Sequence, residues 1–152
     1  MQLVEKQIKK LAGRLIISDK NNINLIFDKL TCDFLNQLSK NILKSKKARN
    51  FTDLISFAFW IRNKNILRIK NFFLLDNLRI GRGIAFHITP SNVPLNFAYS
   101  FVMGLLSGNS NIIRISNRYF EQNDLFLKII NKLFKKQKYK SIKNNNLFLK
   151  YD

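Results

Sequence analysis

The longest uncharged stretch of this chain runs from Gly83 to Ile113, 31 residues in a sequence otherwise rich in lysine. A span of this length is long enough for a transmembrane helix, which needs about 20 predominantly apolar residues. Pro90 and Pro94 interrupt any such helix near its front, and the histidine, serines and asparagines of the span would lack partners in lipid. A buried parallel strand-helix-strand unit explains the same lack of charge. We therefore expect a sheet and no transmembrane segment.

The uncharged stretch divides into two short apolar runs with a helical pattern between them. Residues 83–89 and 112–115 predict strands, because each is a short apolar run bounded by turn residues. Apolar residues recur at helical spacing after Pro94, which fits a first helical turn, and Gly108 can supply a left-handed helix end. A strand, a helix and a strand in this order predict a right-handed crossover between parallel strands.

The N-terminal part of the chain has the pattern of helices. Residues 1–30 contain short strands or turns and no motif, whereas residues 31–44 predict an amphipathic helix with Thr31 or Asp33 as its cap. Residues 52–73 predict one long helix or two broken ones. We interpret this part as scaffold.

A second β-α-β order follows the uncharged stretch. A helix is expected around residues 126–134 and a strand at residues 147–149. We therefore predict an α/β fold, a partial Rossmann-type parallel sheet with an N-terminal helical segment. The expected division is a mainly helical scaffold over residues 1–76 and an incomplete nucleotide-binding βαβαβ unit over residues 77–152. Because the chain stops directly after a strand, we expect a truncated domain.

The charge balance restricts the partners that this chain could have. It carries 27 Lys and Arg against 9 Asp and Glu, a formal net charge of +18. Such a charge can attract nucleic acid or an acidic membrane surface. The densest runs, residues 44–49 and 135–143, fall where loops and helix ends usually carry charge. We expect a solvated Lys-rich surface and no specific nucleic-acid partner, with a basic nucleic-acid or membrane-surface binder as the weaker alternative.

Cysteine usage and the N-terminus indicate the compartment. Cys32 is the single cysteine, which excludes an intramolecular disulfide framework and a cysteine-rich zinc site. The first twenty residues mix charged and apolar side chains throughout, unlike a secretory leader. We expect a cytoplasmic protein with no metal.

Polar residues gather where the two predicted parallel strands end. Ligands of such sheets bind at the carboxyl ends of the strands, here residues 89–92 and 114–117. Arg114 ends an otherwise apolar strand and would face the place where phosphate or ribose binds. Ser116 and Asn117 could cap the next helix or bond ribose hydroxyls, and the two roles are compatible.

Two further residues near this edge are candidates for catalysis. Asn92 could cap the following helix, or donate its amide N–H to an oxygen that becomes negatively charged. The residues alone favour the cap. His87 lies in a predicted strand without a nucleophile or carboxylate at a supporting spacing, which favours a structural role.

A resemblance to a known family rests on residues 81–116, GRGIAFHITPSNVPLNFAYSFVMGLLSGNSNIIRIS. They resemble the acyl-CoA reductases of the bacterial luminescence (LuxC) type, which make a long-chain aldehyde. Residues 57–73, FAFWIRNKNILRIKNFF, are similar to the segment that precedes this motif in the family, so the resemblance covers about residues 30–152. The family is similar in fold to the aldehyde dehydrogenases.

The resemblance also implies a site. It implies that Asn92 is the oxyanion donor and that Arg114 meets the adenosine ribose or its phosphate. Asn117 falls where many NAD-preferring dehydrogenases carry a glutamate, so a neutral residue there points to NADPH, with Ser116 beside it. It further implies that the cofactor is lined by Ile88, Thr89, Pro90 and Ser91.

The family mechanism requires a residue that this chain does not supply. A cysteine thiolate attacks the acyl thioester, and the acyl-enzyme accepts hydride and leaves as aldehyde. That cysteine lies downstream of the motif, whereas Cys32 lies upstream and is not assigned to catalysis. We therefore expect the N-terminal fragment of an NADPH-dependent fatty acyl-CoA reductase, inactive alone. The alternative is a non-catalytic binding or structural partner of a complete reductase.

The expected partners follow from the same resemblance. The substrate would be an acyl-CoA or acyl-protein thioester. A separately encoded C-terminal half or an acyl-protein synthetase would be the protein partner.

Overall fold

The computed structural model describes residues 8–17, 23–73 and 79–151. Its strands are β1 (Lys9–Leu15), β2 (Ile84–Ile88), β3 (Ser110–Arg114) and β4 (Asn145–Lys150). They form one four-stranded sheet in the order β1-β4-β3-β2. Strands β2, β3 and β4 are parallel, and β1 joins β4 antiparallel at the opposite edge. The predicted α/β class with a partial Rossmann-like sheet is confirmed, and the antiparallel edge strand is an addition to it.

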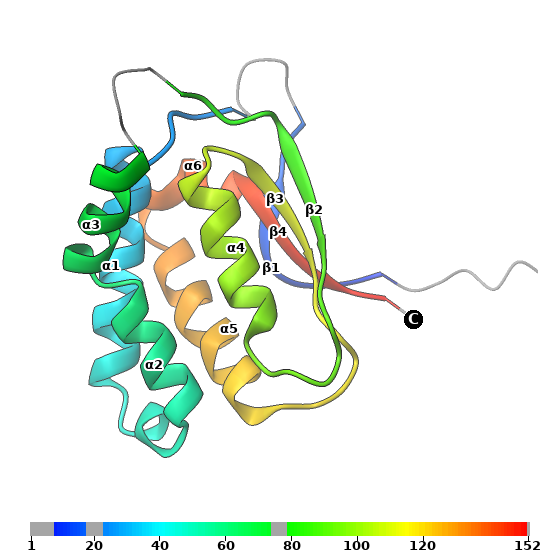
Figure 1. The fold of residues 1–152 in the computed structure, drawn as a ribbon. Coiled ribbons are helices and arrows are strands. Elements are labelled where there is room, and N and C mark those ends of the chain that lie inside the picture. Colours follow the sequence, from blue (N-terminus) through cyan, green and yellow to red (C-terminus); the bar gives the residue numbers. More distant parts are fainter. Residues whose placement is uncertain (1–7, 18–22, 74–78, 152) are drawn as a thin grey trace, which may run out of the picture.

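Helices cover one face of this sheet, as Figure 1 shows for α1 to α5. Short 3-10 turns, η1 (Lys47–Asn50) and η2 (Gln137–Tyr139), precede α2 and α6. The helices are α1 (Lys29–Lys44), α2 (Thr52–Trp60), α3 (Asn63–Phe73), α4 (Asn96–Leu106), α5 (Glu121–Phe134) and α6 (Lys140–Asn144). No helix of the described segments is long and apolar enough to cross a membrane.

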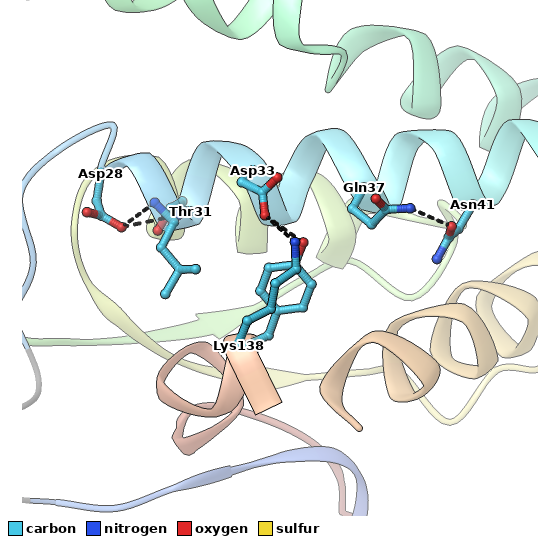
Figure 2. Close-up of polar contacts among 8 residues, drawn as sticks. Asp28, Thr31, Asp33, Gln37, Asn41 and Lys138 are labelled. Atoms are coloured by element: carbon cyan, nitrogen blue, oxygen red, sulfur yellow. Dashed lines mark hydrogen bonds and ion pairs between the residues drawn. The ribbon is translucent and has the colours of Figure 1, made fainter. Parts of the chain in front are cut away.

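The start of α1 differs from the sequence prediction. Asp28 is the cap, and its carboxylate accepts the backbone N–H of Leu30 at 3.0 Å and of Thr31 at 3.1 Å (Figure 2). The predicted caps, Thr31 and Asp33, are therefore wrong, because the helix begins one turn before its apolar pattern. Asp33 instead accepts hydrogen bonds from Lys138 and Tyr139, each at 2.8 Å.

The second helical region is broken in two, one of the two predicted outcomes. Helix α2 ends at Trp60 and α3 begins at Asn63. The N-cap position of α2 is held by Phe51, whose side chain has no acceptor, so neither Thr52 nor Asp53 caps it. The ring of Trp60 packs with its centroid 5.0 Å from that of Tyr99.

A cluster of phenylalanine rings joins the helices to the sheet. Phe57 of α2 contacts Phe126 of α5 at a centroid distance of 5.7 Å, and Phe126 contacts Phe97 of α4 at 5.4 Å. Phe148 of β4 lies 4.8 Å from Phe101 of α4. Each such edge-to-face pair contributes about 0.5 to 1.5 kcal/mol beyond its buried area. The predicted boundary between residues 76 and 77 lies outside the described residues and stays a prediction.

The opposite face of β2 is apolar and open to solvent. Ile84, Phe86 and Ile88 alternate along this edge strand and are 42%, 52% and 66% exposed. The described residues place no helix over this face, as Figure 1 shows. A row of large apolar side chains on a sheet edge marks a contact surface rather than an ordinary solvated strand.

Candidate functional site

The carboxyl ends of the parallel strands lie side by side, as predicted for the edge that binds ligands. Ile88 of β2 pairs with Arg114 of β3, and Arg114 pairs with Leu149 of β4. Residues 88–92 and 114–117 therefore leave adjacent strands at the same edge. This arrangement brings the backbone of the predicted cofactor segment next to a cation.

Arg114 is the charged side chain at the end of β3, and its guanidinium is only partly bonded. One terminal nitrogen donates to the backbone oxygen of Tyr151 at 3.5 Å, and the guanidinium lies 5.2 Å over the Tyr151 ring. The buried Nε of Arg114 has no hydrogen-bond partner within the described structure. Leaving a buried donor unpaired costs about 1 to 3 kcal/mol, more for a charged group.

The loop after β2 carries the predicted oxyanion donor. Thr89 is buried, whereas Pro90, Ser91 and Asn92 are exposed. Because α4 begins only at Asn96, Asn92 does not cap it, and the capping role favoured from the residues alone is wrong. The amide of Asn92 stands on an exposed bend, where it can meet a ligand.

The conformation that ends this loop is held by a residue that sequence reasoning missed. Leu95 has φ of 60°, a left-handed conformation that costs a non-glycine residue about 1 to 2 kcal/mol. Its N–H donates to Oδ1 of the buried Asn123 at 3.0 Å. Asn123 lies three residues before Phe126 and seven before Ile130, so helical spacing places it on the buried face of the predicted helix. A polar residue on that face was the sequence signal that could have identified it. Asn123 is therefore a positioning residue for the Asn92 loop.

The loop after β3 is closed by a local turn. The Oγ of the buried Ser116 accepts the backbone N–H of Arg118 at 3.1 Å, and Asn117 is exposed. The N-cap position of α5 belongs to Phe120, so the predicted capping by Ser116 or Asn117 is wrong. Their expected contact with ribose stays a prediction.

His87 belongs to a chain of buried amides on the helix-covered face of the sheet. Its Nε2 donates to Oδ1 of Asn111 at 2.9 Å, and Nδ2 of Asn111 donates to Oδ1 of Asn146 at 2.7 Å. The amide of Asn146 donates in turn to the backbone oxygen of Ile142 at 2.7 Å. This chain links β2, β3 and β4, and it confirms the structural role expected for His87.

Among the described residues, the other chemistry-bearing side chains do not gather into a reaction centre. Cys32 lies in the first turn of α1, where its Sγ donates to the backbone oxygen of Phe27 at 3.5 Å. Burial raises the pKa of this thiol, which reduces its thiolate fraction. Among the described residues there is no group of three or more His, Cys, Asp or Glu that could hold a metal ion.

Residues 75–143 match the family model described as acyl-CoA reductase (LuxC). This segment, less than half of the chain, is similar to the LuxC type. The match includes both strand ends of the site, with Ile88, Asn92 and Arg114, and it stops short of residues 57–73, to which the resemblance also extended. Comparisons with curated proteins and with solved structures found no match.

The LuxC-type segment relates the carboxyl edge of the sheet to an acyl-CoA reductase, an oxidoreductase acting on acyl groups. Asn123, the positioning residue identified from the structure, lies within the same segment. Cys32 lies outside it, and it is the only thiol in the sequence. The LuxC-type segment therefore holds a cation and an amide suited to binding, and no nucleophilic thiol.

Proposed function

We propose that this chain is the N-terminal portion of an NADPH-dependent fatty acyl-CoA reductase, whose nucleophilic cysteine is supplied by another polypeptide segment. The observation that carries the proposal is Arg114, a cation with a buried unpartnered Nε at the carboxyl edge of a LuxC-type sheet. The side chain of Arg114 is partly exposed, and its guanidinium offers a planar set of donors that matches a phosphate.

The residues of the edge fit a phosphorylated dinucleotide. Arg114 would hold the 2′-phosphate, and the neutral Asn117 would not repel it as a carboxylate would. Ser116 and Asn117 would bond ribose, and Ile88, Thr89, Pro90 and Ser91 would line the nicotinamide side. NADPH, when bound, supplies a hydride for the acyl carbon.

Asn92 would act on the substrate, an acyl-CoA or acyl-protein thioester. Its exposed amide would donate to the thioester oxygen as negative charge develops there. The Leu95 turn and Asn123 would hold the loop in the required position. Preorganisation of this kind makes such donors effective, because the donor need not reorient during the reaction.

The partner would cover the open face of β2. Exposed Ile84 and Phe86 are suited to burial against a separately encoded C-terminal half, and alone the chain would be inactive. The compartment would be the cytoplasm. The second candidate is a non-catalytic structural partner of a complete reductase or of an acyl-protein synthetase, which the same face favours equally well.

The cofactor proposal is tested by titrating the chain with NADPH and NADH and following nicotinamide fluorescence. NADPH should bind at least tenfold more tightly than NADH, and Arg114→Ala should remove most of that preference. Arg49→Ala, an exposed arginine on η1, is the matched control and should leave it unchanged. A preference for NADH would overturn the NADPH assignment.

The fragment proposal needs a separate experiment. Sequencing the gene past the codon for Asp152, in all three frames, should reveal the segment with the missing cysteine. Mixing the two products should restore reduction of acyl-CoA. If no such segment exists and the chain binds a complete reductase without turnover, the structural-partner function is correct.

A further inference from the structure

An apolar groove lies at the end of the sheet opposite to the proposed cofactor edge. It has a volume of about 550 Å³ and is bordered by Phe73 of α3, Met103 and Leu106 of α4, and residues 79–82 before β2. Asn109, which also borders it, directly precedes β3. These positions place the groove at the amino-terminal ends of β2 and β3. Its volume falls within the range of about 300 to 1,000 Å³ found for small-molecule sites.

Apolar side chains form the floor of the groove and part of its rim. Phe27 and Leu106 form a buried floor, 6% and 3% exposed. Phe73 stacks on Phe27 at a centroid distance of 6.5 Å and remains 43% exposed. Ile80 and Met103 are 60% and 48% exposed along the rim. A ligand with an alkyl chain would cover these exposed side chains.

Two arginines, Arg79 and Arg82, border the same groove. The backbone of Arg79 accepts the N–H of Ile26 at 3.2 Å, and the backbone N–H of Arg82 donates to Oδ1 of Asn109 at 2.7 Å. The backbone of each arginine is therefore held against a neighbouring segment by a hydrogen bond. In the part of the chain that the structure describes, neither guanidinium forms an ion pair with a carboxylate.

The choice of arginine here does not follow from the composition of the chain. Lysines number 19 and arginines 8 in the whole sequence, yet every cation between Lys70 and Lys128 is an arginine. Two of these four arginines border the groove, and Arg114 belongs to the proposed cofactor edge. Arginine differs from lysine in offering a planar fork of donors that matches a carboxylate or phosphate.

We propose that this groove binds an anionic amphiphile, a molecule with one alkyl chain and a carboxylate or phosphate head. The alkyl chain of the ligand lies along Phe27, Phe73 and Met103. Its anionic head group meets Arg79 and Arg82. Within the described residues neither guanidinium has a carboxylate partner, and their positive charge favours this occupant over a neutral lipid. The site is separate from the carboxyl edge of the sheet and does not rest on the proposed function.

The test is calorimetric titration of the full chain with decanoate, decyl phosphate and 1-decanol, all below their aggregation concentrations. One molecule of decanoate or decyl phosphate should bind per chain, at least tenfold more tightly than 1-decanol. The anion that binds with the higher affinity identifies the head group. Pelleting of the protein with phosphatidylglycerol vesicles shows whether a membrane lipid is the source of the ligand. Arg79→Gln and Arg82→Gln should each weaken binding of the anion about fivefold.

Two matched controls separate the groove from the general positive charge. Arg49→Gln removes the same charge from an exposed position outside the groove and should leave the affinity unchanged. Met103→Glu puts a carboxylate on the rim and should abolish binding, whereas Leu67→Glu, on a side chain 45% exposed outside the groove, should not. All five substituted side chains are exposed, so the circular dichroism spectra should match that of the unaltered chain.

Three results would overturn the proposal. They are equal affinities for decanoate and 1-decanol, several equivalent sites per chain, or an equal loss in Arg49→Gln. NADPH titration of Met103→Glu keeps the two proposals apart, because an intact NADPH affinity with lost decanoate binding shows that the groove is a separate site.

Discussion

At the scale of single residues, Leu95 shows how the core positions a loop. Its side chain is fully buried, and its left-handed backbone is held by the Oδ1 of Asn123. The exposed Asn92 lies three residues earlier in the same loop. The position of Asn92 therefore depends on a side chain in a helix that follows it by about thirty residues.

Replacing Asn123 with Ala should lower the free energy of unfolding by about 1 to 3 kcal/mol, because the buried Leu95 N–H loses its acceptor. Urea denaturation followed by circular dichroism measures the change. Lys128→Ala, on the exposed face of the same helix, is the control and should stay within about 0.5 kcal/mol. Equal effects of the two substitutions would show that Asn123 has no special role.

A second prediction concerns Asp33, whose pKa is lowered by hydrogen bonds from Lys138 and Tyr139, with the Lys138 contact visible in Figure 2. A carboxyl with a folded pKa below its unfolded value, about 3.9, stabilises the fold above that unfolded value. This contribution is lost as pH falls through the folded pKa. The effect should be small, since the two charged side chains are 51% and 47% exposed. Asp33→Asn should flatten the dependence of the urea midpoint on pH below about 4.

The reactivity of Cys32 gives a third prediction. Burial raises the pKa of this thiol, so its thiolate is scarce at neutral pH. Alkylation by iodoacetamide at pH 7 should be slower than for free cysteine and should accelerate as pH rises. A fast reaction at neutral pH would contradict the exclusion of Cys32 as a nucleophile.

At the scale of elements, the close approach of α4 to the sheet depends on one glycine. A Cβ on Gly104 would lie 1.9 Å from Oδ1 of Asn111, the amide that joins His87 to Asn146. Helix α4 can therefore cover the amide chain only while that position lacks a side chain. The sequence pattern identified this helix and its glycine-rich end, where Gly108 has φ of 76°, but not this contact.

Gly104→Ala should destabilise the chain by about 1 to 3 kcal/mol, because the overpacked amide chain must shift. This cost should exceed the gain in helix propensity, about 1 kcal/mol. Met103→Ala, the neighbouring exposed position on α4, is the control for urea denaturation and should change stability less. A more stable Gly104→Ala variant would show that the amides rearrange freely.

At the scale of the whole molecule, helices on one face leave an apolar sheet face on the other. Phe86→Glu should change the free energy of unfolding of the isolated chain by less than about 0.5 kcal/mol, because the ring is 52% exposed. The same substitution should prevent co-purification with the proposed C-terminal half. Leu67→Glu, exposed on α3, is the control and should co-purify normally. Unimpaired assembly of Phe86→Glu would exclude this face as the contact.

Much of the fold was predictable because its signals are local. The predicted runs at 83–89 and 112–115 overlap β2 and β3, although β3 begins two residues earlier, at Ser110. Helix α4 between them ends at Leu106, two residues before the predicted Gly108. Helix starts were less predictable, since Asp28 lies outside the apolar repeat that marks α1. Of the candidate site, the meeting of the two strand ends was predictable, but the unpartnered Nε of Arg114 was not.

The sequence by itself determined the strand-helix-strand order, the edge where polar residues gather and the absence of a second cysteine, because these depend on local pattern and composition. Only the tertiary structure decided the pairing of β1 with β4, the support of the Asn92 loop by Asn123, and the joining of Phe73, Arg79 and Met103 around one groove. Each of these requires segments distant in the chain to meet. Their contact follows from the packing of the whole core, which no local periodicity specifies.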